Sequence, residues 1–276
     1  MPVGHYENFP VASVLLPARL RHTVAEIYRF ARTADDFADE GDLPPAGRLA
    51  LLEGYRQELR RLQAGEAPGT PLFADLGEVV RDYALPFEPL FDLLDAFSQD
   101  VVKKRYSSFA EVLDYCRRSA DPVGRLMLYL YGEGGAADFE DCLEQSDAVC
   151  SALQLINFWQ DVEIDFAKDR IYLPQDDMAR FGVTERQIAA RRADEGWRAL
   201  MRFQLARARA MLESGAPLAT RLRGRIGLEL RMIVQGGRRI LDKLERAEGD
   251  VFRRRPVLGA FDWPLMLGRA CWMSHV

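Results

Sequence analysis

The spacing of apolar residues is helical along almost the whole chain, and this feature constrains the fold most strongly. Apolar residues recur three or four positions apart, and no segment alternates apolar and polar residues between hairpin turns. Stretches rich in glycine and proline interrupt this periodicity and should end helices. These stretches are 41–47, 64–71, 85–89, 132–138, 174–184, 214–217 and 249–256. We predict an all-α fold of about nine or ten helices, the first starting near Pro17.

The composition favours one domain. The chain has 276 residues, of which 48% are hydrophobic, and this is enough to bury a large core. It contains no repeats, no low-complexity linker and no abrupt change of composition. We therefore predict that residues 1–276 form a single domain.

Two acidic stretches, 35–39 and 161–165, lie within apolar helical segments. Their outer aspartates, Asp35 with Asp39 and Asp161 with Asp165, are four positions apart and so share a helix face. Two such carboxylate pairs facing a cavity would hold divalent cations, and Mg²⁺ usually shares its ligands with substrate phosphates. The pattern favours diphosphate chemistry.

The spacing alone is a weak signal, because Asp165 and Asp169 form a third pair. It is strengthened by polar residues that extend each pair along an otherwise apolar helix. One stripe consists of Tyr28, Arg32, Asp35 and Asp39, and the other of Gln154, Asn157, Asp161 and Asp165. Burying unpaired polar groups costs about 1–3 kcal/mol each, so the stripes need partners such as metal ions. The alternative is a solvated face with a few buried ion pairs.

Charge and residue usage disfavour several other classes of protein. The net charge of −5 provides no basic surface for nucleic acid. Three histidines and the absence of a Glu-x-x-His pair disfavour zinc and di-iron centres. Four cysteines without CxxC spacing indicate reduced thiols. We recognise no signal peptide or membrane-spanning segment, and we expect a cytoplasmic protein that is at most peripheral to the inner face of the membrane.

Two further segments carry residues suited to phosphate binding. Segment 166–184 is predicted to be the longest non-helical stretch, and it could fold over a metal-bound phosphate or simply connect two helices. Its candidate residues are Lys168, Asp169, Arg170 and Tyr172. The triplet Arg253-Arg254-Arg255 follows a long predicted helix, and it could grip phosphate or form a solvated helix end.

Several ordered motifs resemble those of the squalene and phytoene synthase family. The first comprises His5-Tyr6-Glu7-Asn8-Phe9, Leu15-Leu16-Pro17, Ile27-Tyr28, Arg32 and Asp35-Asp36-Phe37-Ala38-Asp39. The second comprises Gln154, Asn157, Asp161-Val162-Glu163-Ile164-Asp165 and Arg170-Ile171-Tyr172-Leu173-Pro174. Between them Asp100, Arg105-Tyr106 and residues 115–124 also align. The resemblance is dense over residues 5–175 and loose beyond them.

The resemblance implies an isoprenoid-synthase helical bundle with a central apolar cavity that takes a prenyl diphosphate. It implies Mg²⁺, or Mn²⁺, held by Asp35, Asp39, Asp161, Asp165 and Asn157, with Gln154 beside them. It also implies that His5 and Arg32 contact diphosphate oxygens and that Tyr172 closes the site. Phe9, Tyr28 and Tyr115 would line the cavity near the reacting carbons.

Residues 117–121 depart from the apolar cavity wall that is usual in the family. Arg118, Ser119 and Asp121 stand there, and Gly236-Gly237 replaces a frequent tyrosine. These changes make the chain similar to the hopanoid-pathway branch, which converts presqualene diphosphate and water to hydroxysqualene, with no NADPH expected. Asp121 could direct the water, with Ser119 holding it, or Asp121 could cap a helix expected to begin at Pro122.

Two alternatives stay open. One is a condensing family member that joins two prenyl diphosphates to presqualene diphosphate, dehydrosqualene or phytoene. The other is a catalytically silent helical assembly protein, which four aspartates at the matched positions disfavour. As partners we expect the prenyl diphosphate, a membrane surface contacted through an apolar rim, and other squalene-pathway enzymes.

Overall fold

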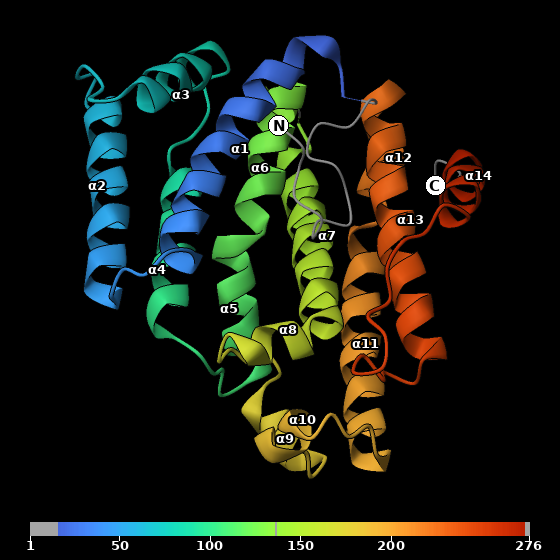
Figure 1. Cartoon of the computed structure of the whole chain (residues 1–276). Coiled ribbons are helices and arrows are strands. Elements are labelled where there is room, and N and C mark those ends of the chain that lie inside the picture. The colour runs from blue at the N-terminus through green and yellow to red at the C-terminus, as the bar shows by residue number, and fades with distance from the viewer. Residues whose placement is uncertain (1–15, 136, 274–276) are drawn as a thin grey trace. The chain divides into compact units, whose positions relative to one another are not determined.

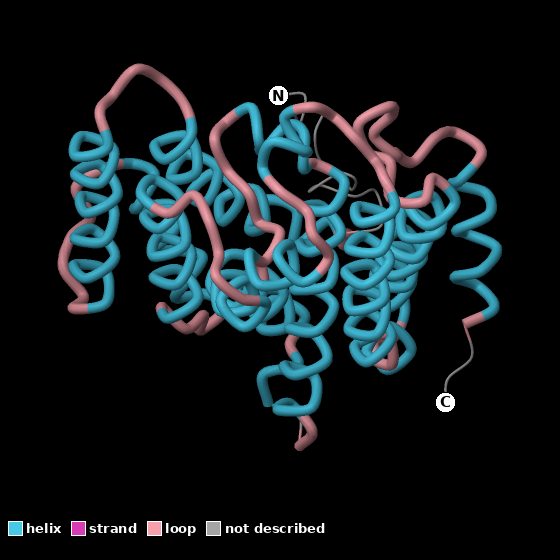
Figure 2. Tube along the Cα trace, turned by 90° about the horizontal axis from the view of Figure 1, so that it is seen from below, coloured by secondary structure: helices cyan, strands magenta, loops and turns pink. Residues whose placement is uncertain are grey.

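The computed structural model describes residues 16–135 and 137–273, and these residues form helices joined by loops (Figures 1 and 2). Within these ranges the only β-type pairing is an isolated parallel bridge between Arg105 and Ile171. The ten longer helices are α1 (Ala18–Asp39), α2 (Pro45–Gln63), α3 (Pro71–Asp82), α4 (Glu88–Val102), α5 (Phe109–Ser119), α6 (Asp121–Tyr131), α7 (Phe139–Gln160), α11 (Glu195–Gly215), α13 (Gly224–Arg246) and α14 (Asp262–Trp272). The short ones are α8 (Val162–Ala167), α9 (Gln175–Arg180), α10 (Glu185–Ala189), α12 (Leu218–Arg221) and the 3-10 turn η1 (Glu133–Gly135). The predicted all-α fold is confirmed.

Prolines and capping side chains set the starts of several helices. Pro17 is the N-cap of α1, as its position in the sequence predicts. Thr70 and Asp194 accept hydrogen bonds from backbone N–H groups in the first turns of α3 and α11. Gly132 ends α6 with φ of +87°, a left-handed conformation that glycine adopts without strain.

Contacts along the chain divide it into two compact units. Unit 1 contains the described residues up to Lys103 together with Arg117–Leu143, and unit 2 contains Lys104–Cys116 and the described residues from Glu144 onward. One unit boundary falls just after α4, and the other two fall within α5 and α7. The single domain over residues 1–276 stays a prediction.

In unit 1, α1 packs against α2, α3 and α4, and α4 also packs against α6 (Figure 1). Aromatic rings fill the interface of α1 with α2 and α3. The Phe30 ring lies 5.8 Å from that of Tyr55 and 6.0 Å from that of Phe73, centre to centre. This core holds α1, which carries the first acidic stretch, in place.

In unit 2, α13 lies between α11 and α14 (Figure 1) and also contacts α12. Gly237 lets α13 approach its neighbours closely. A Cβ atom added there would lie 2.9 Å from Leu153 Cδ2 on α7 and 3.0 Å from Leu212 Cδ2 on α11. A tyrosine at this position would not fit without a shift of these side chains.

No helix in the described part of the chain combines the length and the apolar character that crossing a bilayer requires.

Candidate functional site

The C-terminal end of α1 concentrates negative charge. Asp35, Asp36, Asp39 and the C-cap Glu40 lie there, and the last turn contains no basic residue. A helix C-terminus already carries partial negative charge, so these carboxylates raise the local potential further. Arg32 lies one turn before them, with Nη1 3.5 Å from Asp35 Oδ2 and Nη2 2.8 Å from Asp36 Oδ1. Among the described residues, four carboxylates lie near the guanidinium groups of Arg32 and Arg48 at this helix end, and we expect the end of α1 to attract cations.

The Asp35 carboxyl is partly buried beside other carboxylates, and both conditions affect its pKa. Burial, and then the neighbouring Asp39 carboxylate, raise the pKa of Asp35 from 3.8 to about 6, against the opposing effect of Arg32. Asp100 on α4 adds to the increase. The predicted pairing of Asp35 with Asp39 is therefore electrostatically strong, and a bound cation would relieve it.

Arg48 on α2 fixes the end of α1 from a position that the sequence did not single out. Its Nη1 donates to the carbonyl oxygens of Phe37 at 3.3 Å and Ala38 at 2.7 Å, and its Nη2 donates to that of Gly41 at 2.6 Å. These carbonyls lack helical partners at a helix end, so the guanidinium acts as a C-cap. Arg48 thereby positions the acidic turn.

An apolar pocket of about 320 Å³ opens beside the acidic turn in unit 1. Residues of α1 form one wall, and residues of α4, α5 and α6 form the rest. The lining residues are Val24, Ile27, Tyr28, Ala31, Arg32, Asp35, Leu93, Phe97, Ser119, Val123, Leu126 and Met127. Three predicted site residues, Tyr28, Arg32 and Asp35, thus face one cavity. The contributions of Leu93, Phe97 and Met127 were not predicted, because no motif in the sequence includes these apolar residues.

Ser119 is the polar residue among the lining residues that α4, α5 and α6 contribute. Its Oγ is buried, and it has no hydrogen-bond partner among the described residues. A buried hydroxyl without a partner costs about 1–3 kcal/mol, and a water or ligand atom in the pocket would remove that cost.

Asp121 is buried and is the first residue of α6. The expectation that it caps a helix beginning at Pro122 is wrong, because α6 starts one residue earlier and its N-cap is Ala120. A carboxylate in the first turn still interacts favourably with the helix dipole. Asp121 does not line the pocket, whereas Ser119 and Val123 on either side of it do.

The second acidic stretch, in unit 2, is not carried on one continuous helix as the spacing predicted. α7 ends at Gln160, Asp161 has φ of −103° and ψ of 11°, and α8 begins at Val162. Hydrogen bonds from Asp161 N to Asn157 O and from Asp165 N to Asp161 O nevertheless keep the four-residue spacing across the break. Gln154 and Asn157 lie half-buried on α7, and Asp165 lies on α8.

Arg255 binds the Asp161 carboxylate through both oxygens, and its Nη2 lies 3.1 Å from Oδ2. Arg255 belongs to the triplet Arg253-Arg254-Arg255, which the sequence suggested as a phosphate-binding site. In the structure its partner is a carboxylate. The pair is bidentate and partly buried, a strong form of ion pair. Asp161 therefore has a bidentate cationic partner, whereas the contact of Asp35 with Arg32 is a single, longer one of 3.5 Å.

Tyr115 and Tyr172 belong to an aromatic cluster in unit 2. The Tyr172 ring stacks on Phe158 with centroids 3.8 Å apart, and it lies 5.7 Å from Tyr115 and 5.4 Å from Tyr106. Both tyrosines are buried. Tyr115, which was predicted to line the cavity, thus meets Tyr172, which was predicted to close the site, and both rings pack against other rings.

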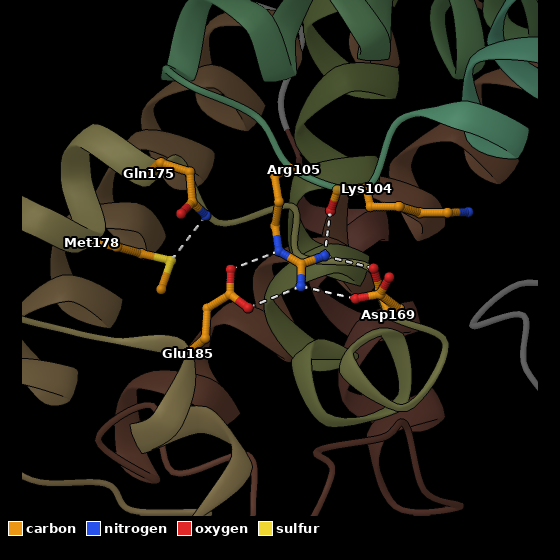
Figure 3. Close-up of polar contacts among 6 residues, drawn as sticks. All are labelled: Lys104, Arg105, Asp169, Gln175, Met178 and Glu185. Atoms are coloured by element: carbon orange, nitrogen blue, oxygen red, sulfur yellow. Dashed lines mark hydrogen bonds and ion pairs between the residues drawn. The ribbon is translucent and has the colours of Figure 1, made fainter.

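Segment 166–184 is neither wholly irregular nor loosely held. Residues Gln175–Arg180 form α9, so the predicted long non-helical stretch is wrong over that range. Arg105 anchors the segment (Figure 3): its Nη1 donates to Asp169 O at 2.6 Å, its Nη2 to Asp169 Oδ1 at 2.9 Å and its Nε to Glu185 Oε1 at 2.7 Å. Ile171 N also donates to Lys104 O at 3.0 Å. Asp169, a predicted phosphate contact, is bound to Arg105.

The metal site stays a prediction. Among the described ranges, no three histidine, cysteine, aspartate or glutamate side chains form a group that could hold a metal ion unaided. His5 and Phe9, the predicted diphosphate and cavity residues of the N-terminal motif, lie outside the described residues.

Comparison with known proteins agrees with the motifs. A model of the squalene/phytoene synthase family matches residues 3–262. The hydroxysqualene synthase of Sinorhizobium fredii is 34% identical over 241 residues, which cover 87% of this chain and 80% of that protein. The phytoene synthase of Arthrospira platensis is 32% identical over 262 residues, which cover 90% of this chain and 83% of that protein.

Solved structures show the same fold. The crystal structure of squalene synthase HpnC from Alicyclobacillus acidocaldarius matches with a TM-score of 0.80 at 39% identity, covering 88% of this chain and 90% of that one. A dehydrosqualene synthase in complex with a ligand matches with a TM-score of 0.81 at 24% identity, covering 93% and 88%. The fold is that of the helical isoprenoid synthases, and the chain belongs to the squalene/phytoene synthase family.

Proposed function

We propose that this chain converts presqualene diphosphate and water to hydroxysqualene and diphosphate, a step of hopanoid biosynthesis. The carbon–oxygen bond to diphosphate breaks, and a carbon–hydroxyl bond forms after the carbocation rearranges. No electrons are gained or lost overall, so the reaction needs no NADPH. Similarity to hydroxysqualene synthases over most of the chain supports this assignment.

The observation that carries the proposal is the Ser119 hydroxyl. It is a buried polar atom that has no partner within residues 16–135 and 137–273, on a residue that lines a mostly apolar pocket with Arg32 and Asp35. A reaction that ends in capture by water needs one ordered water in a site that excludes bulk solvent. Ser119 can hold that water by a hydrogen bond. The proton that the water loses on attack can pass to the departing diphosphate, which is a base.

Mg²⁺, or Mn²⁺, is the proposed cofactor, and the end of α1 fits it. Burial and the neighbouring Asp39 carboxylate raise the pKa of Asp35, and a divalent cation bound there would favour the charged form of both carboxyls. Asp161, Asp165 and Asn157 offer a second set of oxygen ligands, of which Asp161 must exchange Arg255 for the metal. Bound Mg²⁺ would neutralise charge developing on the diphosphate oxygens.

The remaining roles follow from the chemistry of the side chains. Arg32 offers planar, charge-assisted donors to diphosphate oxygens, with His5 as a second proposed contact. Tyr28 presents a ring to the pocket, where cation–π attraction stabilises a carbocation by about 0.5–2 kcal/mol. Gln154 supports the second ligand set. Phe9, Tyr115 and Tyr172 are proposed to shield the reacting carbons from water.

Product analysis tests the proposed function. Purified protein is given presqualene diphosphate and Mg²⁺ in ¹⁸O-labelled water, without a reductant. Mass spectrometry should find hydroxysqualene carrying one ¹⁸O, and EDTA should abolish it. Squalene formed only with NADPH, or no consumption of presqualene diphosphate, would contradict the proposal.

A condensing reaction is the second candidate, favoured by the match to phytoene synthases over 90% of the chain. Incubation with farnesyl or geranylgeranyl diphosphate alone distinguishes it, because only a condensing enzyme releases diphosphate from these substrates. Substrate and product are long hydrocarbons, so we also propose peripheral membrane contact at the cytoplasmic face. We further propose association with the enzymes that supply presqualene diphosphate and consume hydroxysqualene.

A further inference from the structure

The last helix of the described chain, α14, contacts the rest of unit 2 through one narrow stripe. Asp262, Met266 and Ala270 are its buried residues, and each lies four positions from the next. All the remaining residues of α14 are exposed. The stripe rests on α13, and Figure 1 shows α14 on the side of α13 away from α11. Most of the circumference of this helix is therefore uncovered.

The uncovered part of α14 is apolar. Trp272 is 87% exposed and Phe261, immediately before the helix, is 94% exposed. Trp263, Leu265 and Leu267 are also exposed, and Arg269 is the only charged residue among the exposed positions of α14. At 100° per residue these side chains extend around both flanks and the outward face. Contiguous exposed apolar residues of this kind mark an interaction surface.

A cationic hollow of about 460 Å³ adjoins the start of α14. Lys243, Arg253, Arg254 and one acidic residue, Asp250, contribute the charges that line it. Lys243 Nζ donates to Val257 O at 2.7 Å and also binds the Asp262 carboxylate, so the hollow is tied to the first residue of α14.

Asp262 keeps its charge in this arrangement. Burial alone would raise its pKa, but Lys243, the Gly259 N–H and Arg239 together hold that pKa well below its usual value. These contacts fix α14 at its N-terminal end, next to the hollow. The exposed aromatic residues and the cationic hollow thus form one surface, which we call the α14 surface: residues 261–272 with Lys243, Arg253, Arg254 and Val257.

Building on the peripheral membrane contact proposed above, we propose that the α14 surface binds the headgroup region of an anionic phospholipid bilayer. Tryptophan and phenylalanine suit the boundary between headgroups and acyl chains. Arg254 and Arg253, whose Nε lies 3.2 Å from Asp250 Oδ2, suit lipid phosphates, whereas Lys243 is already bound to Asp262. The chain has a net charge of −5, so a local cationic hollow is needed for it to approach an anionic membrane. A second copy of the chain fits less well, because a symmetric interface would bring two cationic hollows together.

Vesicle binding of the full chain tests this proposal, independently of its enzymatic activity. Two of the four tryptophans, Trp159 and Trp197, are fully buried, so a change in emission on lipid binding reports Trp263 and Trp272. We expect a blue shift and co-sedimentation with phosphatidylglycerol vesicles, weaker with phosphatidylcholine and weakened by salt. Brominated acyl chains should quench the emission.

The variants assign the binding to the α14 surface. Phe261→Gln with Trp272→Gln should reduce vesicle partition at least about tenfold, because two aromatic side chains no longer leave water. Arg253→Gln with Arg254→Gln should remove the preference for anionic lipid. Val102→Gln and Arg60→Gln are matched controls on exposed positions of unit 1, with exposed fractions of 63% and 57%, and should bind as the unaltered chain does.

Sedimentation velocity of the same proteins without lipid tests whether a second copy of the chain, rather than a bilayer, occupies the α14 surface. Absence of vesicle binding, or equal binding by Phe261→Gln/Trp272→Gln, would overturn the proposal. A dimer that dissociates in that double variant, with no vesicle binding by either protein, would overturn it in favour of a second copy.

Discussion

At the scale of single residues, Asp35 determines how this protein responds to pH. Its folded-state pKa of about 6 is above the value of 3.8 for an unperturbed carboxyl, so the folded chain binds this proton more tightly than the unfolded chain does. The stabilisation is fully present below about pH 4 and is lost as pH rises through 6. In EDTA we expect the free energy of unfolding of the unaltered chain, relative to Asp35→Asn, to decrease between pH 4 and 6.

Urea titrations at several pH values measure this difference. Asp42→Asn, at an exposed position just beyond α1, is the control and should keep the pH dependence of the unaltered chain. The Asp35 side chain is 38% exposed, so solvent screening limits the size of the effect. Parallel curves for Asp35→Asn and the unaltered chain would contradict the assignment.

Ser119 is predicted to determine the product rather than the rate of ionisation. In Ser119→Ala the pocket has no hydroxyl to order a water, and the carbocation should lose a proton to form an alkene more often. Gas chromatography with mass spectrometry should find the ratio of hydroxysqualene to alkenes reduced by about tenfold or more, the scale of one lost hydrogen bond to a reacting group. Ser119→Thr retains the hydroxyl and should restore much of the ratio. An unaltered ratio of hydroxysqualene to alkenes in Ser119→Ala would contradict the proposal that Ser119 holds the water.

At the scale of elements, the end of α1 depends on Arg48. Arg48→Ala removes donors from the carbonyls of Phe37, Ala38 and Gly41, and it should destabilise the fold by about 1–3 kcal/mol. Because the acidic turn frays, the Mg²⁺ concentration for half-maximal activity should rise. Arg60→Ala, an exposed arginine of the same helix, should change neither quantity. Normal metal dependence in Arg48→Ala would show that the turn keeps its shape unaided.

Arg105 has the corresponding role for segment 166–184. Hydrogen bonds to Glu185 raise its pKa above the ordinary value, despite burial, and those to Asp169 add to the effect. Arg105→Gln should increase hydrogen exchange of the backbone N–H groups of residues 168–172, including that of Ile171, which bonds Lys104 O. Arg192→Gln, at an exposed position in the same unit, is the control. Unchanged exchange in Arg105→Gln would mean that the backbone hydrogen bonds to Lys104, Tyr106 and Ser107 hold the segment without the guanidinium.

The sequence predicted the elements better than their contacts, for a physical reason. Helical periodicity and breakers are local signals, so the positions of the long helices and the polar stripe of α1 could be predicted. The bond between Arg255 and Asp161 joins residues 94 positions apart, and no periodicity encodes such a pairing. The break at Asp161 was also missed, because its neighbours have good helical spacing.

At the scale of the whole molecule, ligands that bind only the folded state should stabilise it. Mg²⁺ with pyrophosphate at about one hundred times the dissociation constant contributes about 2.7 kcal/mol, which corresponds to a rise in Tm of roughly 5–11 °C for a chain of this size class. Asp35→Asn with Asp39→Asn should abolish this rise, and Asp42→Asn should keep it. Differential scanning fluorimetry provides the measurement. An equal rise in the double variant would place the metal and diphosphate elsewhere.

The reaction that the protein catalyses could be predicted from the sequence only through the ordered motifs that it shares with a known family. Composition and periodicity led to a helical protein with paired carboxylates, which many enzymes and binding proteins share. The motifs narrowed this to one family, and the pocket lined by Tyr28, Arg32 and Asp35 is consistent with them. The contributions of Leu93 and Phe97 on α4 and of Leu126 and Met127 on α6 depend on tertiary packing, and no motif in the sequence includes them.

The four thiols of the chain differ greatly in their contact with solvent. Cys116 and Cys142 are buried, Cys150 is partly buried and Cys271 is exposed on α14. Two copies of an exposed thiol can form a disulfide by giving two electrons to dissolved oxygen and releasing two protons. Air oxidation during purification would therefore link chains through the apolar side of α14 and produce covalent dimers. A reductant, or Cys271→Ser, keeps that artefact apart from any association that the protein has of its own.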